Sequence, residues 1–329
     1  RWIADLAGLP QSSGGVFVQG GTMGNLSALV VARAQARKHF PDTTRWVIAC
    51  SEQAHSSIAS AAQVMDVDVL EIAVDEHGKL QGDAVGKEID ALHRQSGRRV
   101  FAVVATAGTT NLGIIDDLAG IGAAAKAREI WFHVDGAYGL AALCAPSVRT
   151  LFNGIENVDS LIVDPHKWLF APYDACALIY RTPELAREVH TQHASYLDTL
   201  HDGNWNPSDY AIQLTRRTRG LPFWFSLAAY GTDAYSEAME QSLEVAKYAA
   251  KKVSEHPNLK LLCEPELSIV AFTRTGWTAS DYQKWSDELL TEQVGFIPPS
   301  SHDGQPILRF AIVNPWTKFS DIDLILQRL

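Results

Sequence analysis

Short apolar runs alternate with stretches of helical periodicity over the first two thirds of the chain. Such alternation favours βαβ units and a mostly parallel sheet. The runs are apolar almost throughout, as expected for strands that helices cover on both faces. The expected helices span 25–38, 57–65, 83–95 and 117–128, and the expected strands span 15–18, 46–50, 69–74, 99–106, 130–134 and 160–163.

The next apolar run, ACALIYR at 175–181, follows the strand at 160–163 too closely for a crossover, which predicts an antiparallel strand. After Gly231 the pattern changes to a long helix (about 232–255), followed by a mixture of strands and helices. The sequence therefore predicts an α/β domain over 1–230 and a smaller α+β domain over 231–329. The later strands are expected at 259–262, 267–273 and 306–313, and the later helices at 281–291 and 320–328.

Composition narrows the classes of protein. The 329 residues are 47% hydrophobic and 20% charged, which is typical of a globular protein with one large core and a smaller one. The net charge of -10 argues against nucleic acid or an anionic membrane as a partner. The four cysteines form no CxxC pair, which indicates reduced thiols in a cytoplasmic protein, and no metal site is expected.

Residues that can carry chemistry follow five of the predicted strands. The carboxyl ends of parallel strands meet at one edge of a sheet, where α/β proteins bind ligands. Each such residue has an ordinary structural explanation alone, but their convergence predicts a binding site. In chain order they are the turn 20–24 (GGTMG), His55, Thr109 with Thr110, Asp135, and Lys167.

The turn at 20–24 opens the first long helix and fits an anion. Its glycines let the backbone approach a phosphate, and the free N–H groups of a helix start hold one. A plain tight turn is the structural alternative. The turn matches neither GxGxxG nor the P-loop pattern, which argues against dinucleotides and nucleoside triphosphates.

Asp135 and Lys167 add two further elements. A carboxylate at the end of an apolar strand needs a donor or a cation, and a protonated ring nitrogen is one such partner besides a helix start or an ion pair. Lys167 stands between two apolar runs, and a desolvated lysine is an amine nucleophile. Together with a phosphate site and His55 to stack on a ring, these residues meet the requirements of pyridoxal 5'-phosphate (PLP).

Several motifs resemble, in order and spacing, those of the group II PLP-dependent decarboxylases, the family of aromatic-L-amino-acid, histidine and glutamate decarboxylases. The resemblance implies the fold type I architecture of aspartate aminotransferase (the PLP-transferase fold), with a seven-stranded sheet, and a homodimer with shared active sites. It extends over nearly the whole chain. The motifs are GVFVQGGTMGNLSAL, SEQAHSSI, ATAGTTNLGIIDDL, WFHVDGAYG, DPHKWL, SDYAIQLTRRTRGLPFW and ILRFAIVNPWTKFSDIDLIL.

The resemblance implies roles for single residues. Lys167 is implied as the Schiff-base lysine, Asp135 as the partner of the ring nitrogen N1, and His55 as the residue that stacks on the ring and assists catalysis. The other implied cofactor-binding positions are Gly21, Thr22, Asp164 and His166 at the phosphate, and Thr110 and Ala137 at the ring. Asp164 departs from the asparagine that is common before PHK in the family.

Two further residues are implied outside the cofactor site. Tyr196, in ASYLD, matches the loop tyrosine that protonates the carbanion after CO2 leaves. Arg309 matches an arginine that contacts the substrate carboxylate in glutamate decarboxylases, although a structural arginine is the alternative. The family's N-terminal segment, which embraces the partner subunit and supplies part of the substrate pocket, has no counterpart in this sequence.

The implied reaction is decarboxylation of an L-amino acid to an amine and CO2, through an external aldimine and a quinonoid. Trp168, after His-Lys, favours an aromatic substrate, whereas Arg309 keeps an acidic one open. An aldehyde synthase or an aminotransferase would use the same cofactor. A non-catalytic or nucleotide-binding α/β protein, with a structural lysine and aspartate, is the alternative from another class.

Overall fold

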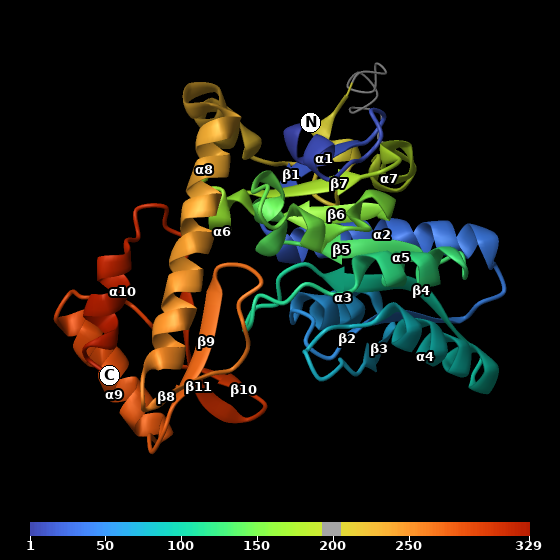
Figure 1. Cartoon of the computed structure of the whole chain (residues 1–329). Coiled ribbons are helices and arrows are strands. Elements are labelled where there is room, and N and C mark those ends of the chain that lie inside the picture. The colour runs from blue at the N-terminus through green and yellow to red at the C-terminus, as the bar shows by residue number, and fades with distance from the viewer. Residues whose placement is uncertain (193–204) are drawn as a thin grey trace.

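The protein is described here by a computed structural model, in which residues 1–192 and 205–329 are placed. Figure 1 shows a large sheet with helices on both sides, a smaller sheet formed by the later residues, and the long helix α8, which runs from beside the large sheet to the smaller one. The arrangement matches the predicted order of an α/β part followed by an α+β part.

The large sheet has seven strands in the order β1-β7-β6-β5-β4-β2-β3. The strands β6, β5, β4, β2 and β3 run parallel to one another, whereas β7 is antiparallel to both β6 and β1. The antiparallel strand predicted at 175–181 is thereby confirmed. The strands are β1 (Gly14–Val18), β2 (Arg45–Ser51), β3 (Asp68–Ile72), β4 (Arg98–Thr106), β5 (Trp131–Asp135), β6 (Ser160–Val163) and β7 (Cys176–Tyr180).

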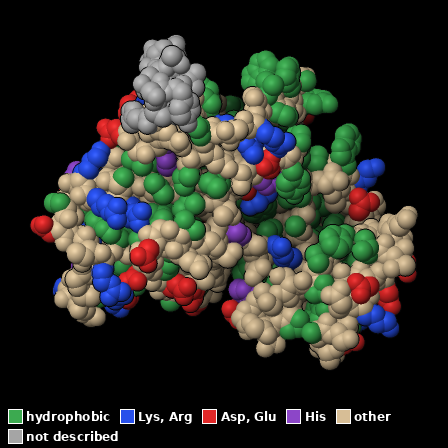
Figure 2. Space-filling view, turned by 180° about the vertical axis from the view of Figure 1, so that it is seen from behind, with side chains coloured by type: hydrophobic (Ala, Val, Ile, Leu, Met, Phe, Trp, Pro, Cys, Tyr) green, Lys and Arg blue, Asp and Glu red, His purple; other side chains and the backbone are tan. Residues whose placement is uncertain are grey.

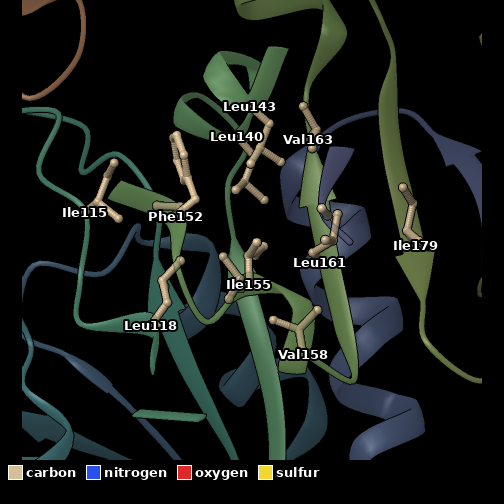
Figure 3. Packing of buried hydrophobic residues seen from close by; sticks show 14 of the residues in the cluster. Ile115, Leu118, Leu140, Leu143, Phe152, Ile155, Val158, Leu161, Val163 and Ile179 are labelled. Carbon is tan, nitrogen blue, oxygen red and sulfur yellow. The ribbon is translucent and has the colours of Figure 1, made fainter. Parts of the chain in front are cut away.

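Helices cover both faces of this sheet. One face packs against α2 (Gly21–His39), α3 (Ser57–Met65) and α7 (Pro183–His190), and the other packs against α4 (Gly82–Gln95) and α5 (Leu118–Lys126). Figure 3 shows part of the core on the α5 side, where apolar side chains of short 3-10 turns meet those of the strands. The remaining short elements of this part are α1 (Trp2–Leu6), α6 (Pro165–Trp168) and 3-10 turns at Gly139–Cys144, Arg149–Phe152, Ile155–Asn157 and Pro207–Asp209.

The smaller sheet is antiparallel, in the order β10-β11-β9-β8. It has its own apolar core, to which α8, α9 and α10 contribute. The elements are α8 (Gly220–Glu255), β8 (Leu259–Leu261), β9 (Ile269–Arg274), α9 (Ala279–Thr291), β10 (Ser300–His302), β11 (Gln305–Ala311) and α10 (Phe319–Leu326).

The long helix expected from about 232 is present, but α8 also includes a helical segment before Gly231 that was not expected and that begins at Gly220. Pro222 lies in the first turn, where a missing N–H costs nothing. Gly231 interrupts the helical geometry with φ 77° and ψ 163°, and helix continues on both sides of it. We propose Gly231 as the boundary between the large part and the small one, as the sequence predicts.

Helix α2 lies close to the sheet at Gly24. A Cβ atom there would lie 2.8 Å from Ile162 Cγ2 and 3.0 Å from Cys176 Sγ. Gly24→Ala is therefore expected to lower the free energy of unfolding by about 1–3 kcal/mol, as overpacking does. Urea denaturation of the cofactor-free protein measures this. Gly97→Ala is the control, because nothing lies within 4 Å of the added methyl group, and an equal loss in both variants would contradict the prediction.

Candidate active site

Asp135, the last residue of β5, is buried, and its carboxylate accepts hydrogen bonds from two donors. Oδ2 accepts a hydrogen bond of 2.8 Å from Asn25 Nδ2, and Oδ1 accepts one of 3.1 Å from the backbone N–H of Ala137. An ionised carboxylate accepts hydrogen bonds only, so both contacts suit its charged form. The structure thus supplies a fixed negative group at the carboxyl edge of the sheet.

Lys167 lies at the same edge, on α6 directly after β6. Its Nζ is 3.1 Å from Asp164 Oδ2, and its side chain is 39% exposed, so the lysine is less buried than its apolar flanks suggest. Asp164 is buried, and its other oxygen, Oδ1, has no hydrogen-bond partner among the described residues. A buried carboxylate oxygen without a donor is costly, which marks this place for a further polar group. His166 Nε2 lies 3.7 Å from Asp164 Oδ2.

The first turn of α2 completes this corner. No side chain caps the helix start, so its first N–H groups are available to an anion. A Cβ atom at Gly21 would lie 3.2 Å from Asp164 Oδ2 and 3.4 Å from Ala137 Cβ. Three residues expected at the cofactor, Gly21, Ala137 and Asp164, are therefore neighbours in space, and Thr22 follows Gly21 on the exposed side of the turn.

His55, after β2, is connected to Asp135 by hydrogen bonds. Its Nδ1 accepts from the backbone N–H of Ser57 at 3.1 Å and lies 2.9 Å from Ser57 Oγ. Asn25 Nδ2 donates both to this Ser57 Oγ, at 2.9 Å, and to Asp135. The ring of His55 is exposed at the sheet edge, as required of a residue that is to stack on a ligand.

The loop after β4 brings the small sheet to the site. Thr110 is exposed there, and its carbonyl accepts a hydrogen bond from Nη1 of Arg309 on β11. Burial lowers the pKa of the Arg309 guanidinium. Arg309 is therefore placed beside another predicted site residue, whereas Tyr196 lies outside the described residues.

Asp116 fixes the same loop. Its carboxylate accepts from the backbone N–H groups of Thr106, at 2.7 Å, and Leu80, at 2.9 Å, and burial raises its pKa to about 7. The native state thus binds a proton between the unfolded pKa and about 7, and this contribution to stability is lost as the pH rises through that window. The free energy of unfolding of the unmodified protein, relative to that of Asp116→Asn, is therefore expected to fall by about 3 kcal/mol between about pH 5 and about pH 8.

Urea denaturation of both proteins at the two pH values measures this difference. Asp287→Asn, at an exposed position of α9, is the matched control and is expected to track the unmodified protein at both. If Asp116→Asn shows the same change in the free energy of unfolding with pH as the unmodified protein, Asp116 does not titrate in this range.

Trp168 does not reach the site directly. It is fully buried, and its ring stacks on Tyr138 with the centroids 5.0 Å apart. Any effect of Trp168 on substrate choice is therefore indirect, through the packing behind Lys167.

The sequence did not single out Asn25, Ser57, His133 and Ser160 as site residues, yet hydrogen bonds connect all four to Asp135. One signal was present. His133 and Asp135 are two positions apart on one strand, so their side chains share a face of the sheet. That spacing does not indicate that Asn25 on α2 binds both side chains.

The conserved domain of pyridoxal-dependent decarboxylases matches residues 1–275 of the chain. The chain belongs to this family. It is a group II PLP-dependent amino-acid decarboxylase, a carboxy-lyase with PLP as its cofactor.

The chain is similar to individual decarboxylases of this family. An aromatic-L-amino-acid decarboxylase of Bacillus atrophaeus is 29% identical, over 100% of this chain and 71% of that protein. An acidic amino acid decarboxylase of Xenopus tropicalis is 31% identical, over 96% of this chain and 67% of that protein. The solved structure of Oryza sativa TDC with PLP and tryptamine superposes with a TM-score of 0.90, at 22% identity, over 99% of this chain and 74% of that one. The shared architecture confirms the predicted fold type I.

The residues at the sheet edge fit PLP. The uncapped start of α2 suits a phosphate, Asp135 suits a protonated ring nitrogen, and the exposed amine of Lys167 suits an aldehyde. Over the described residues, no helix is both long and apolar enough to cross a membrane.

Proposed function

We propose that the chain removes the α-carboxylate of an L-amino acid and releases the amine, with Lys167 and Asp135 as its principal catalytic residues. One observation carries the proposal: the amine of Lys167, the doubly held carboxylate of Asp135 and the uncapped start of α2 meet at one sheet edge of a PLP-dependent decarboxylase.

Each residue has a definite task in this proposal. Lys167 would hold the cofactor through its amine, Asp135 would keep a proton on the ring nitrogen, and His55 would pack on the ring face. When bound, PLP supplies a sink for the electron pair that remains at Cα when CO2 departs. The remaining cofactor contacts would come from Gly21, Thr22, Asp164 and His166 at the phosphate and from Thr110 and Ala137 at the ring.

Tyr196 is proposed as the acid that protonates Cα, because ASYLD matches the loop tyrosine of the family. Tyr196→Phe is then expected to lower amine formation about 100-fold or more, as loss of a general acid does, and to yield aldehyde in aerobic buffer. Chromatography of the products measures both. A variant that still releases only amine at the original rate would remove Tyr196 from the mechanism.

For the substrate we propose an aromatic L-amino acid. The likeness to the Bacillus atrophaeus enzyme supports it, because that relative is an aromatic-L-amino-acid decarboxylase and is matched over the whole of this chain. An acidic substrate is the second candidate, because Arg309 places a guanidinium beside Thr110 and because the Xenopus relative decarboxylates acidic amino acids.

Measurement of CO2 release from the common L-amino acids, 3,4-dihydroxyphenylalanine and 2,4-diaminobutyrate separates the two candidates. Aromatic substrates are expected to have the highest kcat/KM. Preference for glutamate or aspartate, lost in Arg309→Met, would establish the acidic alternative instead. Absence of CO2 from every substrate, with PLP bound, would favour an aminotransferase.

We propose further that the protein acts as a homodimer, and the first third of α8 supports this. Leu221, Trp224, Phe225 and Tyr230 are all exposed there, and Figure 2 shows hydrophobic side chains gathered at the end of α8 that projects beyond the large sheet. Apolar surface of this kind is typical of an interface. Sedimentation of the protein and of Trp224→Glu tests it.

A cytoplasmic location is also proposed, and the four free cysteines support it.

A further inference from the structure

A buried line of hydrogen bonds runs behind Asp135, away from the site. Trp131 Nε1 donates to Ser160 Oγ at 2.8 Å, and that oxygen lies 2.8 Å from His133 Nδ1. His133 Nε2 lies 2.9 Å from Asn25 Oδ1, and Asn25 Nδ2 reaches Asp135 at 2.8 Å. Asn25, His133 and Ser160 are completely buried, so water does not compete for these bonds.

The chemistry of the groups fixes the direction of every bond. An ionised Asp135 only accepts, so the amide nitrogen of Asn25 faces it and the amide oxygen faces His133. His133 must then donate from Nε2. Complete burial lowers the pKa of His133 to about 4, so the ring is neutral and its Nδ1 accepts. The hydroxyl of Ser160 donates to that nitrogen while it accepts from the indole of Trp131, which can only donate.

A branch of the same line of hydrogen bonds orients His55. Asn25 donates its other amide proton to Ser57 Oγ, which leaves the Ser57 hydroxyl proton for His55 Nδ1. The backbone N–H of Ser57 points at this Nδ1 as well. The proton of a neutral His55 therefore lies on Nε2, and one amide, that of Asn25, orients both His55 and Asp135.

We propose that Asn25 and His133 are positioning residues for the reaction: His133 fixes the amide of Asn25, and that amide orients the carboxylate of Asp135 and fixes the tautomer of His55. The inference rests on the proposed role of Asp135 toward the ring nitrogen. A merely structural role for the same residues would affect folding stability alone, because a folded variant would then bind the cofactor as before.

Asn25→Asp is the sharpest variant, because it is isosteric and replaces the donor that faces Asp135 with an acceptor. PLP affinity of the cofactor-free protein is expected to fall about tenfold to 100-fold, the effect of losing a hydrogen bond to a charged group. The visible absorption band of bound PLP is expected to change, and kcat is expected to fall more than KM rises. Ser242→Ala removes a buried hydroxyl that donates to the Ala238 carbonyl within α8, and it is expected to change stability but not PLP affinity.

His133 supplies a second comparison, which holds even if Asn25→Asp does not fold. His133→Gln keeps an N–H donor near the position of Nε2, whereas His133→Phe removes it at similar volume. PLP affinity and absorption are expected to be close to those of the unmodified protein in the first variant and to be lost in part in the second. Equal behaviour of the two variants would overturn the role of His133.

Nitrogen NMR of labelled histidine in the cofactor-free protein tests the bond directions without any reaction. A neutral ring protonated on Nε2 is expected, and His133→Gln identifies its signal by removing it. A ring protonated on Nδ1 would overturn the inference. Unchanged PLP affinity and absorption in Asn25→Asp would overturn it as well, while CO2 release by the unmodified protein would still support the proposed function.

Discussion

Lys167→Arg is expected to lower CO2 release by about a thousandfold or more, because an always-protonated guanidinium is no amine nucleophile. Arginine keeps a cation beside Asp164, so the buried carboxylate that lies 3.1 Å from Lys167 Nζ is not left unpaired. The loss is therefore assigned to the chemistry of the amine rather than to the ion pair. Release of labelled CO2 from the best substrate, at saturating PLP, measures it.

Lys284→Arg is the matched control, because Lys284 is an exposed lysine of α9 that forms an ion pair with Glu288. Its activity and its unfolding midpoint are expected to equal those of the unmodified protein. Substantial CO2 release by Lys167→Arg, with the fold intact, would remove Lys167 from its catalytic position.

Asp135→Asn is expected to lower kcat about 100-fold to a thousandfold, the range seen when one preorganised electrostatic contact is removed from an active site. The amide that replaces the carboxylate carries no charge and cannot hold a proton on a ring nitrogen. It also turns a donor toward either Asn25 Nδ2 or the backbone N–H of Ala137, which breaks one of the two bonds present in the structure. Steady-state kinetics of CO2 release measures the change.

Asp159→Asn provides the control for losing a carboxylate at the end of a strand. Asp159 precedes β6 and accepts a hydrogen bond of 2.8 Å from the backbone N–H of Phe132, but it lies at the opposite edge of the sheet from Lys167. This variant is expected to lose stability and to keep its kcat. If Asp135→Asn loses no more activity than Asp159→Asn, the ring-nitrogen role is wrong.

Much of the fold was predictable because period and spacing report local structure. Continuous apolar runs identified the strands of the large sheet, and the short distance between 160–163 and 175–181 identified the antiparallel β7. The long helix after Gly231 was predicted, but the helical segment that precedes this glycine in α8 was not. Gly231, at φ 77° and ψ 163°, breaks the helical geometry, so α8 consists of two helical segments joined at a kink.

The candidate site was predictable as far as it depends on strand ends. Asp135 ends β5 and Lys167 follows β6, so topology alone brings them to one edge. Asn25 was not predictable, because its partners Asp135 and His133 lie 110 and 108 positions away and only the packing of α2 on β5 joins them. Arg309 is similar, since its contact with Thr110 joins β11 of the small sheet to the loop after β4.

Borohydride reduction shows which lysine holds the cofactor. The protein is loaded with PLP, reduced, digested and mapped by mass spectrometry, with Lys167→Arg treated in parallel. The expected result is a visible absorption band that reduction abolishes, with reduced cofactor on the peptide that contains Lys167 and none in the variant. A protein that gains no absorption with PLP, or one that carries the reduced cofactor on a different lysine, would contradict the proposed site.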